Sequence, residues 1–163
     1  GTASRTFTIT VKKKAVYTVG NYRYAITNAR TNGKGTVSLT SVKSNSTRKK
    51  LKKIVVNSSV KIGGKNFKVT AIGNNAFKNC SKAGSAEIKE NVTNIGSKAF
   101  YNCKKLKKLT IKSTKLKKVG KNAFQKISSK AVINVPKSKL KAYKKILQGK
   151  GQKKGVEISG AKK

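Results

Sequence analysis

A nine-residue motif recurs three times in the second half of the chain. It occupies Ile72–Cys80, Ile95–Cys103 and Val119–Ile127, at spacings of 23 and 24 residues. In each copy a Gly follows the first Ile or Val, two residues intervene, and an Ala-Phe pair comes next. Repetition at a period in the twenties is typical of a solenoid, in which each repeat forms one coil. The motif therefore predicts a stack of similar coils.

The composition suits such a fold. The 163 residues are enough for one domain with a buried core, although only 36% of them are hydrophobic. A solenoid tolerates this low fraction because its core is thin and each repeat contacts only its neighbours. The apolar residues recur periodically, which argues against disorder.

The charge is extreme. The chain has 41 Lys and Arg residues, only three acids (Glu87, Glu90 and Glu157) and no His, for a net charge of +38. Such a protein attracts polyanions, over a range that salt limits to roughly 8–10 Å. Candidate partners are nucleic acid, anionic cell-wall polymers, sulfated or sialylated glycans and acidic membrane surfaces. The alternative is that the lysines only keep a repeat protein soluble.

Residues 6–47 show the alternation of β-strands. Phe7, Ile9 and Val11 fall on one face, and two later segments repeat the pattern between Gly- and Asn-rich turns. We expect three or four antiparallel strands that form an N-terminal cap over the open edge of the first coil. Residues 1–5 are interpreted as a remnant of a tag or a linker.

The solenoid is expected to span residues 48–136. Residues 49–56 align without a gap with residues 104–111, which indicates a degenerate first coil before the three motif copies. The strand that follows in the stack is Ala86–Ile88, nine residues later than the repeat requires. The insertion at 60–69 contains a Gly-Gly turn and predicts a β-hairpin.

The C-terminal segment predicts a second cap at residues 137–158. Four apolar side chains fall on one face of a helix: Leu140, Tyr143, Ile146 and Leu147. Gly149 is a suitable helix end. Val156–Ile158 is expected to add a short strand, with residues 159–163 as a linker.

The recurring aromatic residues are expected to pack in the core. Stacked coils place equivalent residues about 4.8 Å apart, so that Phe77, Phe100 and Phe124 would form a ladder. We expect the Ala-Phe pair to lie on a short helical turn that fills the coil, and the preceding Gly to permit a tight bend. The alternative is that these rings stack on a ligand.

Cys80 and Cys103 occupy equivalent positions in successive copies. The third copy has Ile127 there, which indicates a core position. Buried free thiols, a disulfide between coils and a functional thiol remain open. Side chains stacked in parallel register are poorly aimed for a disulfide.

The motif resembles a known family. Val69–Cys80 and Val92–Cys103, and more loosely Leu116–Ile127, are similar to the BspA-type leucine-rich repeats of bacterial surface proteins. The resemblance implies a β-rich (α+β), right-handed leucine-rich-repeat solenoid. It also implies a secreted or wall-anchored module for adhesion to host proteins, matrix proteins or other bacteria. We therefore expect an extracellular or cell-surface fragment of a larger secreted protein. The family has no shared catalytic residues to transfer, and the lysine content and missing Asp of this chain depart from it.

Nothing in the sequence indicates catalysis. Without His there is no imidazole base and no usual metal-ligand set. Glu87 and Glu90 flank Lys89, as expected for charge balance rather than a carboxylate pair. Gly63-Gly64-Lys65 lacks the spacing of a phosphate-binding loop. We expect a monomer that is not an enzyme, with no cofactor, no metal and no transmembrane segment.

Lysines gather just before the predicted strands. The nine candidate ligand-binding residues are Lys49, Lys50, Lys52, Lys53, Lys82, Lys104, Lys105, Lys107 and Lys108. Stacking would turn them into a basic ridge, which is either solvated or a polyanion site.

The resulting hypothesis is a non-catalytic binding or adhesion module. Its expected partner is an anionic cell-wall polymer, an acidic glycan or a host or bacterial surface protein. One alternative is a basic nucleic-acid-binding protein, although nucleic-acid motifs are missing and nonspecific DNA binding in vitro is expected from charge alone. The other is a ligand-free spacer between domains.

Overall fold

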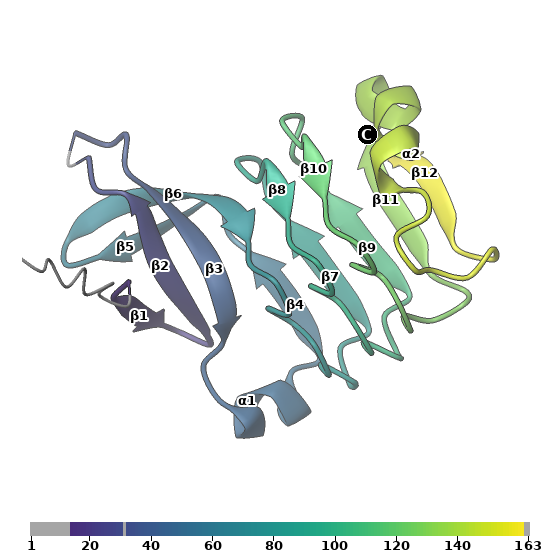
Figure 1. Cartoon of the computed structure of the whole chain (residues 1–163), viewed down its shortest axis with the longest axis horizontal. Coiled ribbons are helices and arrows are strands. Elements are labelled where there is room, and N and C mark those ends of the chain that lie inside the picture. Colours follow the sequence, from purple (N-terminus) through teal and green to yellow (C-terminus); the bar gives the residue numbers. More distant parts are fainter. Residues whose placement is uncertain (1–13, 31, 162–163) are drawn as a thin grey trace, which may run out of the picture.

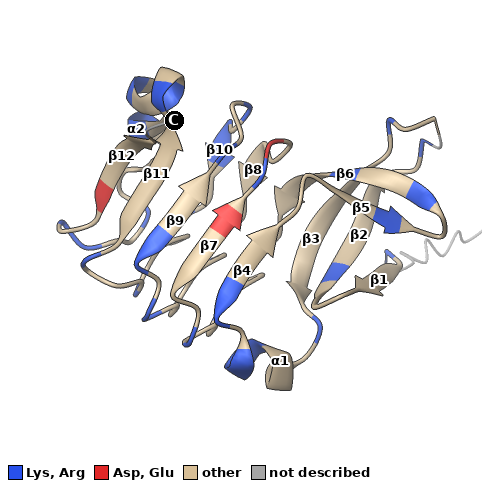
Figure 2. Cartoon of the chain, turned by 180° about the vertical axis from the view of Figure 1, so that it is seen from behind, with Lys and Arg blue, Asp and Glu red and all other residues tan. Residues whose placement is uncertain are grey.

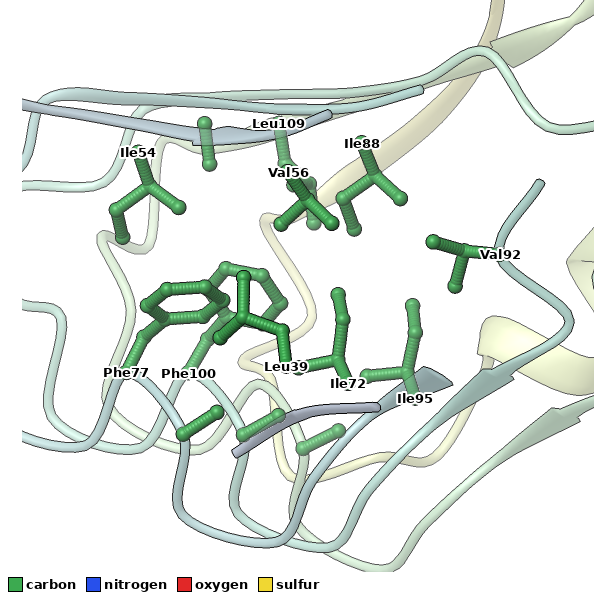
Figure 3. Packing of buried hydrophobic residues seen from close by; sticks show 14 of the residues in the cluster. Leu39, Ile54, Val56, Ile72, Phe77, Ile88, Val92, Ile95, Phe100 and Leu109 are labelled. Atoms are coloured by element: carbon green, nitrogen blue, oxygen red, sulfur yellow. The ribbon is translucent and has the colours of Figure 1, made fainter. Parts of the chain in front are cut away.

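The computed structural model describes residues 14–30 and 32–161. In this part of the chain, successive coils stack side by side along the long axis (Figure 1). Strands of two sheets line the opposite sides of each coil and send their apolar side chains into the space between them (Figure 3). The mostly β, repeat-built architecture expected from the motif is confirmed.

The strands of the described residues fall into two sheets. The first has the order β1-β2-β3-β6-β8-β10, with β5 paired to β6. Its strands are β1 (Val16–Val19), β2 (Tyr22–Asn28), β3 (Thr36–Val42), β5 (Ser59–Ile62), β6 (Lys65–Ile72), β8 (Asn94–Ile95) and β10 (Lys118–Val119). The second has the order β12-β11-β9-β7-β4 and contains β4 (Lys53–Val56), β7 (Ser85–Ile88), β9 (Lys108–Ile111), β11 (Val132–Pro136) and β12 (Glu157–Ala161).

The second sheet has the register that the repeat alignment predicts. Ile54 pairs with Ala86, Ala86 with Leu109, and Leu109 with Ile133, all in parallel strands. These four side chains are buried, while alternate positions face outward. The nine-residue offset before β7 is taken up by the predicted hairpin, β5–β6, which turns at Gly63-Gly64.

The N-terminal strands continue the first sheet. β1, β2 and β3 pair in antiparallel fashion, and β3 then pairs with β6 in parallel. Val37 and Leu39 of β3 are fully buried, so this part shares the core of the coils. The strand expected at Phe7, Ile9 and Val11 lies outside the described residues.

A short helix, α1 (Asn45–Lys50), spans the boundary predicted between residues 47 and 48. No apolar periodicity indicates this helix in the sequence, because none of its residues is buried and it has no apolar face. Its one local signal is the N-cap: the Ser44 hydroxyl accepts a hydrogen bond from the Thr47 amide at 3.1 Å.

The motif itself forms tandem β-turns, not the expected helical turn. In the first copy the Ala76 amide donates to Gly73, and the Cys80 amide donates to Phe77. The third residue of each turn, Asn75 or Asn79, has a positive φ of 59° or 64°. Such turns favour Asn or Gly at that position because other residues resist the left-handed conformation.

Hydrogen bonds between coils occupy the amides that the turns leave over. In the first copy the amides of Asn75, Phe77 and Asn79 donate to carbonyls of the second copy. The two ends of this ladder are closed by other groups. The Arg48 guanidinium donates to the carbonyls of Ala76 and Lys78, and the Lys150 carbonyl accepts from the Phe124 amide. Hydrogen bonds between coils thus run through the first two copies and continue at each end of the motif stack through one further group.

Two of the three motif glycines, Gly96 and Gly120, are required by contact between coils rather than by a tight bend. Neither Gly96 nor Gly120 has a positive φ. A Cβ atom at Gly120 would lie 2.4 Å from the Ser97 nitrogen, and one at Gly96 would lie 2.5 Å from the Asn74 nitrogen. Any side chain would force neighbouring coils apart.

The motif phenylalanines stack along the core. Phe77, Phe100 and Phe124 are fully buried. Their ring centroids lie 5.2 Å and 6.0 Å apart, with interplanar angles of 30° and 27°. Tyr22 meets the first ring edge-on at 5.8 Å. Figure 3 shows Phe77 and Phe100 between the apolar side chains of the two sheets, which leaves their faces no access to a ligand.

The two cysteines are buried and free. The Cys103 thiol donates to the Phe77 carbonyl oxygen at 3.2 Å, across neighbouring coils. The hydrogen bond between the two thiols, together with burial, raises the pKa of Cys103, and the same hydrogen bond lowers the pKa of Cys80. Both residues therefore behave as small core side chains, as Ile127 does in the third copy.

The C-terminal segment adds a helix and a strand to the end of the stack. After β11 come a 3-10 turn (Lys137–Lys139) and α2 (Leu140–Leu147), which buries Tyr143 and Leu147. The Tyr143 hydroxyl donates to the Ser113 carbonyl at 2.7 Å and accepts from the Leu116 amide at 3.0 Å. β12 pairs with β11 through residue 161, so the linker predicted at 159–163 is wrong for Ser159–Ala161.

Replacing Phe100 with Ala should lower the free energy of unfolding by about 3–5 kcal/mol, because it opens a cavity between two stacked rings. Chemical denaturation followed by circular dichroism measures this loss. Lys104→Ala, at an exposed position one turn later, is the control and should be nearly neutral. A Phe100→Ala protein as stable as the control would contradict the stacked core.

Neither thiol should react quickly with Ellman's reagent in the folded protein, because both side chains are fully buried. Burial is the deciding factor for Cys80, since its pKa is lowered while that of Cys103 is raised. In guanidinium chloride both should react at once. Rapid labelling of the native protein would instead show an accessible thiol, and no labelling after denaturation would show a disulfide.

Candidate functional site

The nine lysines singled out in the sequence lie where the chain enters the strands of the second sheet. We call them the lysine edge: Lys49, Lys50, Lys52, Lys53, Lys82, Lys104, Lys105, Lys107 and Lys108. All nine are exposed. Figure 2 shows blue segments at the starts of β4 and β9 and in the turns below the strands.

The register divides this edge instead of making the continuous ridge expected. Lys53 and Lys108 both pair with Ser85, one from each side. Gly84 lies in the same way between Lys52 and Lys107, since its amide donates to the Lys52 carbonyl and its carbonyl accepts from the Lys107 amide. The coil between the two lysine pairs is therefore uncharged at these positions.

Two further lysines depart from the expected alignment. Lys49 and Lys50 were expected to match the turn residues Lys104 and Lys105. They lie instead on the last turn of α1, where their charge favours the negative end of the helix dipole. Lys82 remains as the one basic turn residue of the middle coil.

The interruption forms a small hollow on the outer face of the sheet. Its volume is about 130 Å³, and its lining includes Lys53, Lys108, Ser85, Glu87 and Thr110. Two lysines flank the small Ser85 side chain, and Glu87 is the one carboxylate of the lining, so its charged side chains are two lysines and one acid.

Glu87 is the one acid of this lining. Its carboxylate lies 2.9 Å from the Lys112 ammonium and 4.0 Å from the Lys53 ammonium. The hydrogen bond from Lys112, with the nearby lysine charges, lowers the pKa of Glu87. The carboxylate is thus held ionised and balanced by lysine, an arrangement that suits charge neutralisation rather than proton transfer.

Neither a metal-ligand cluster nor a helix that could cross a membrane occurs among the described residues. No three His, Cys, Asp or Glu side chains gather there at metal-binding distances. None of the helices between residues 14 and 161 is long and apolar enough to cross a membrane.

A second group of lysines was not singled out in the sequence. The ammonium nitrogens of Lys78, Lys98 and Lys126 all lie over the ring of Tyr101. These residues come from three successive motif copies. The available signal was small: Lys98 and Lys126 stand where the other copies have Asn.

Comparison with known proteins agrees with this architecture. A family model described as the BspA type leucine rich repeat region, in six copies, matches residues 58–159. A search of curated proteins finds no match.

Three solved bacterial structures are similar. A leucine rich cell surface protein from Faecalibacterium prausnitzii is 28% identical, with a TM-score of 0.61, over 82% of this chain and 36% of its own. This chain thus spans little more than a third of that protein. A leucine-rich repeat protein from Bacteroides capillosus is 22% identical, with a TM-score of 0.65, over 89% of this chain and 99% of its own. One from Bacteroides ovatus is 17% identical, with a TM-score of 0.53, over 89% and 41%.

The last two likenesses concern the fold alone. The family model covers well over half of the residues and includes all three motif copies. The chain therefore belongs to the BspA-type leucine-rich repeat family.

Proposed function

We propose that the chain is a non-catalytic binding module of a bacterial surface protein that holds an acidic polymer along its lysine edge. The polymer is an acidic glycan or an anionic cell-wall polymer. The observation that carries the proposal is the hollow over Ser85, flanked by Lys53 and Lys108. An extracellular location agrees with the cell-surface relative from F. prausnitzii.

The spacing of the edge suits a chain of regularly spaced anions. Stacked coils repeat about every 4.8 Å, so that the lysine pairs on β4 and β9, two coils apart, stand roughly 10 Å apart. Longer contact along the edge would add the lysines of α1 and of the turns. A net charge of +38 also opposes self-association, which supports a monomer.

The lysine-for-glutamine variant K52Q/K53Q/K107Q/K108Q should bind a sulfated oligosaccharide or a teichoic acid at least about tenfold more weakly than the wild type, because charge-assisted contacts are lost. Biosensor titrations at two salt concentrations measure this, and wild-type affinity should fall as salt rises. The matched control is K141Q/K144Q/K145Q/K154Q, which removes the same charge from exposed positions elsewhere.

If both variants lose the same affinity, binding depends on net charge alone, and a site at the lysine edge is refuted. A duplex DNA arm tests the nucleic-acid alternative. Tighter binding to DNA than to both polymers, lost in the edge variant alone, would favour that alternative. If the wild-type protein binds no polymer even at low salt, the proposed binding function is refuted. The ligand-free spacer between domains would then be the remaining role.

A further inference from the structure

Three ammonium groups converge on one aromatic side chain outside the lysine edge. The Lys78, Lys98 and Lys126 nitrogens lie 5.5, 5.6 and 5.5 Å from the centroid of the Tyr101 ring. Since each nitrogen lies within 5.6 Å of the same centroid, any two of them lie within twice that distance of each other. We call these four residues the Tyr101 cluster. Tyr101 and Lys78 are half-buried, and Lys98 and Lys126 are exposed.

Two of the lysines occupy backbone positions that disfavour lysine. Among the described residues, six non-glycine residues have a positive φ: Asn75, Asn79, Lys98, Asn102, Asn122 and Lys126. They are the third residues of the tandem turns, where Asn is suited and a long side chain is not. The two exceptions to Asn, Lys98 and Lys126, are two of the three lysines that lie over Tyr101.

Lys126 also interrupts a ladder of asparagine side chains. The Asn102 amide nitrogen donates to Asn79 Oδ1 at 2.9 Å, one coil away. Asn102 Oδ1 is buried and has no hydrogen-bond partner. The next coil has Lys126 at the equivalent position, where an Asn could donate to that oxygen. Lysine at 126 therefore leaves a buried acceptor unpaired as well as occupying an unfavourable backbone conformation.

The cluster has no carboxylate to balance it. The ion pairs of the described residues both involve Glu87, which is bound to Lys53 and Lys112 on the second sheet. Three like charges held around one ring repel one another, and the tyrosine ring offsets this only through weak cation–π attraction. A bound anion would relieve the repulsion. Backbone strain that persists at a surface position is a common mark of function.

We propose that the Tyr101 cluster binds a sulfate group of a sulfated glycan. The ammonium groups of Lys78, Lys98 and Lys126 supply charge and hydrogen-bond donors for the sulfate, and the Tyr101 ring and hydroxyl contact the attached sugar. The aromatic ring favours a sugar over a flexible polyol phosphate, because a sugar ring offers a flat C–H face that can pack on it. This assignment rests on the proposed acidic-polymer function and narrows it to one ligand class and a second site.

The decisive variant is K98N/K126N, which gives both turns the residue used in the other copies. The sulfated probe is a heparin-derived hexasaccharide, measured by isothermal titration calorimetry. We expect binding to weaken at least about tenfold. The melting temperature should stay unchanged or rise, because asparagine suits the left-handed positions and its amide at position 126 could donate to Asn102 Oδ1. K141Q/K144Q, which removes the same charge from α2, should bind within about threefold of the wild type at physiological salt.

Two further variants separate this site from the lysine edge. Y101L should weaken binding while keeping all the charge, because it removes the ring that contacts the sugar. K52Q/K107Q weakens binding only through the edge. A loss in K52Q/K107Q with none in K98N/K126N would overturn the Tyr101 site and leave the proposed function intact. A wild-type protein that binds no acidic polymer would overturn both.

The remaining outcomes also test whether the Tyr101 cluster binds a sulfated glycan. A lower melting temperature for K98N/K126N would show that Lys98 and Lys126 stabilise the fold. It would refute the inference that these two lysines serve binding at a cost in stability. Equal affinity for a glycerol-phosphate oligomer, or for the desulfated hexasaccharide, would refute recognition of a sulfated sugar. Binding of the hexasaccharide alone, lost in K98N/K126N and Y101L, would support it.

Discussion

The close stacking of coils is the constraint on which the rest of the structure depends. Because parallel strands lie only about 4.8 Å apart, each backbone amide must find its acceptor in its own coil or in the next one. The tandem turns meet this requirement by sending alternate amides to the turn itself and to the next coil. Gly96 and Gly120 meet it by having no Cβ where the neighbouring backbone lies 2.5 Å and 2.4 Å from that position. The Arg48 guanidinium and the Lys150 carbonyl supply at the two ends part of what a further coil would have supplied.

The same stacking explains how a chain with a net charge of +38 can fold. The core is a continuous row of apolar side chains, and the described lysines are kept outside it. The edge lysines come from two local Lys-Lys-Leu-Lys-Lys segments, residues 49–53 and 104–108, which the stack places two coils apart. The lysines of the Tyr101 cluster occupy three different positions of the motif, and the stacking of three coils brings their ammonium groups over one ring. The edge is therefore visible in the sequence, whereas the cluster is produced by the fold.

Much of the core could be predicted from the sequence, because its signals are periodic. The pairing of Ile54 with Ala86 and of Ala86 with Leu109 follows from aligning the repeats, and so does the stacking of Phe77 on Phe100. Features set by local backbone conformation were missed. The polar helix α1 has no apolar face that could reveal it. Each tandem turn has a hydrogen bond between residues i and i+3, which a 3-10 helical turn also has. The division of the lysine edge depends on Gly84 and Ser85, whose register only the pairing reveals. The Tyr101 cluster required knowing that Lys98 and Lys126 have positive φ.

The Phe124 amide differs from its equivalents Phe77 and Phe100 in the acceptor of its hydrogen bond. The Phe77 and Phe100 amides donate to the next motif copy, whereas the Phe124 amide donates to Lys150, in the segment between α2 and β12. That segment contains three glycines within seven residues, Gly149, Gly151 and Gly155, and is mostly exposed. Its opening would free the Phe124 amide while the two earlier amides remain bonded. Hydrogen exchange along the three motif copies should therefore be graded, fastest at the last, so that the solenoid loosens from its C-terminal coil inward.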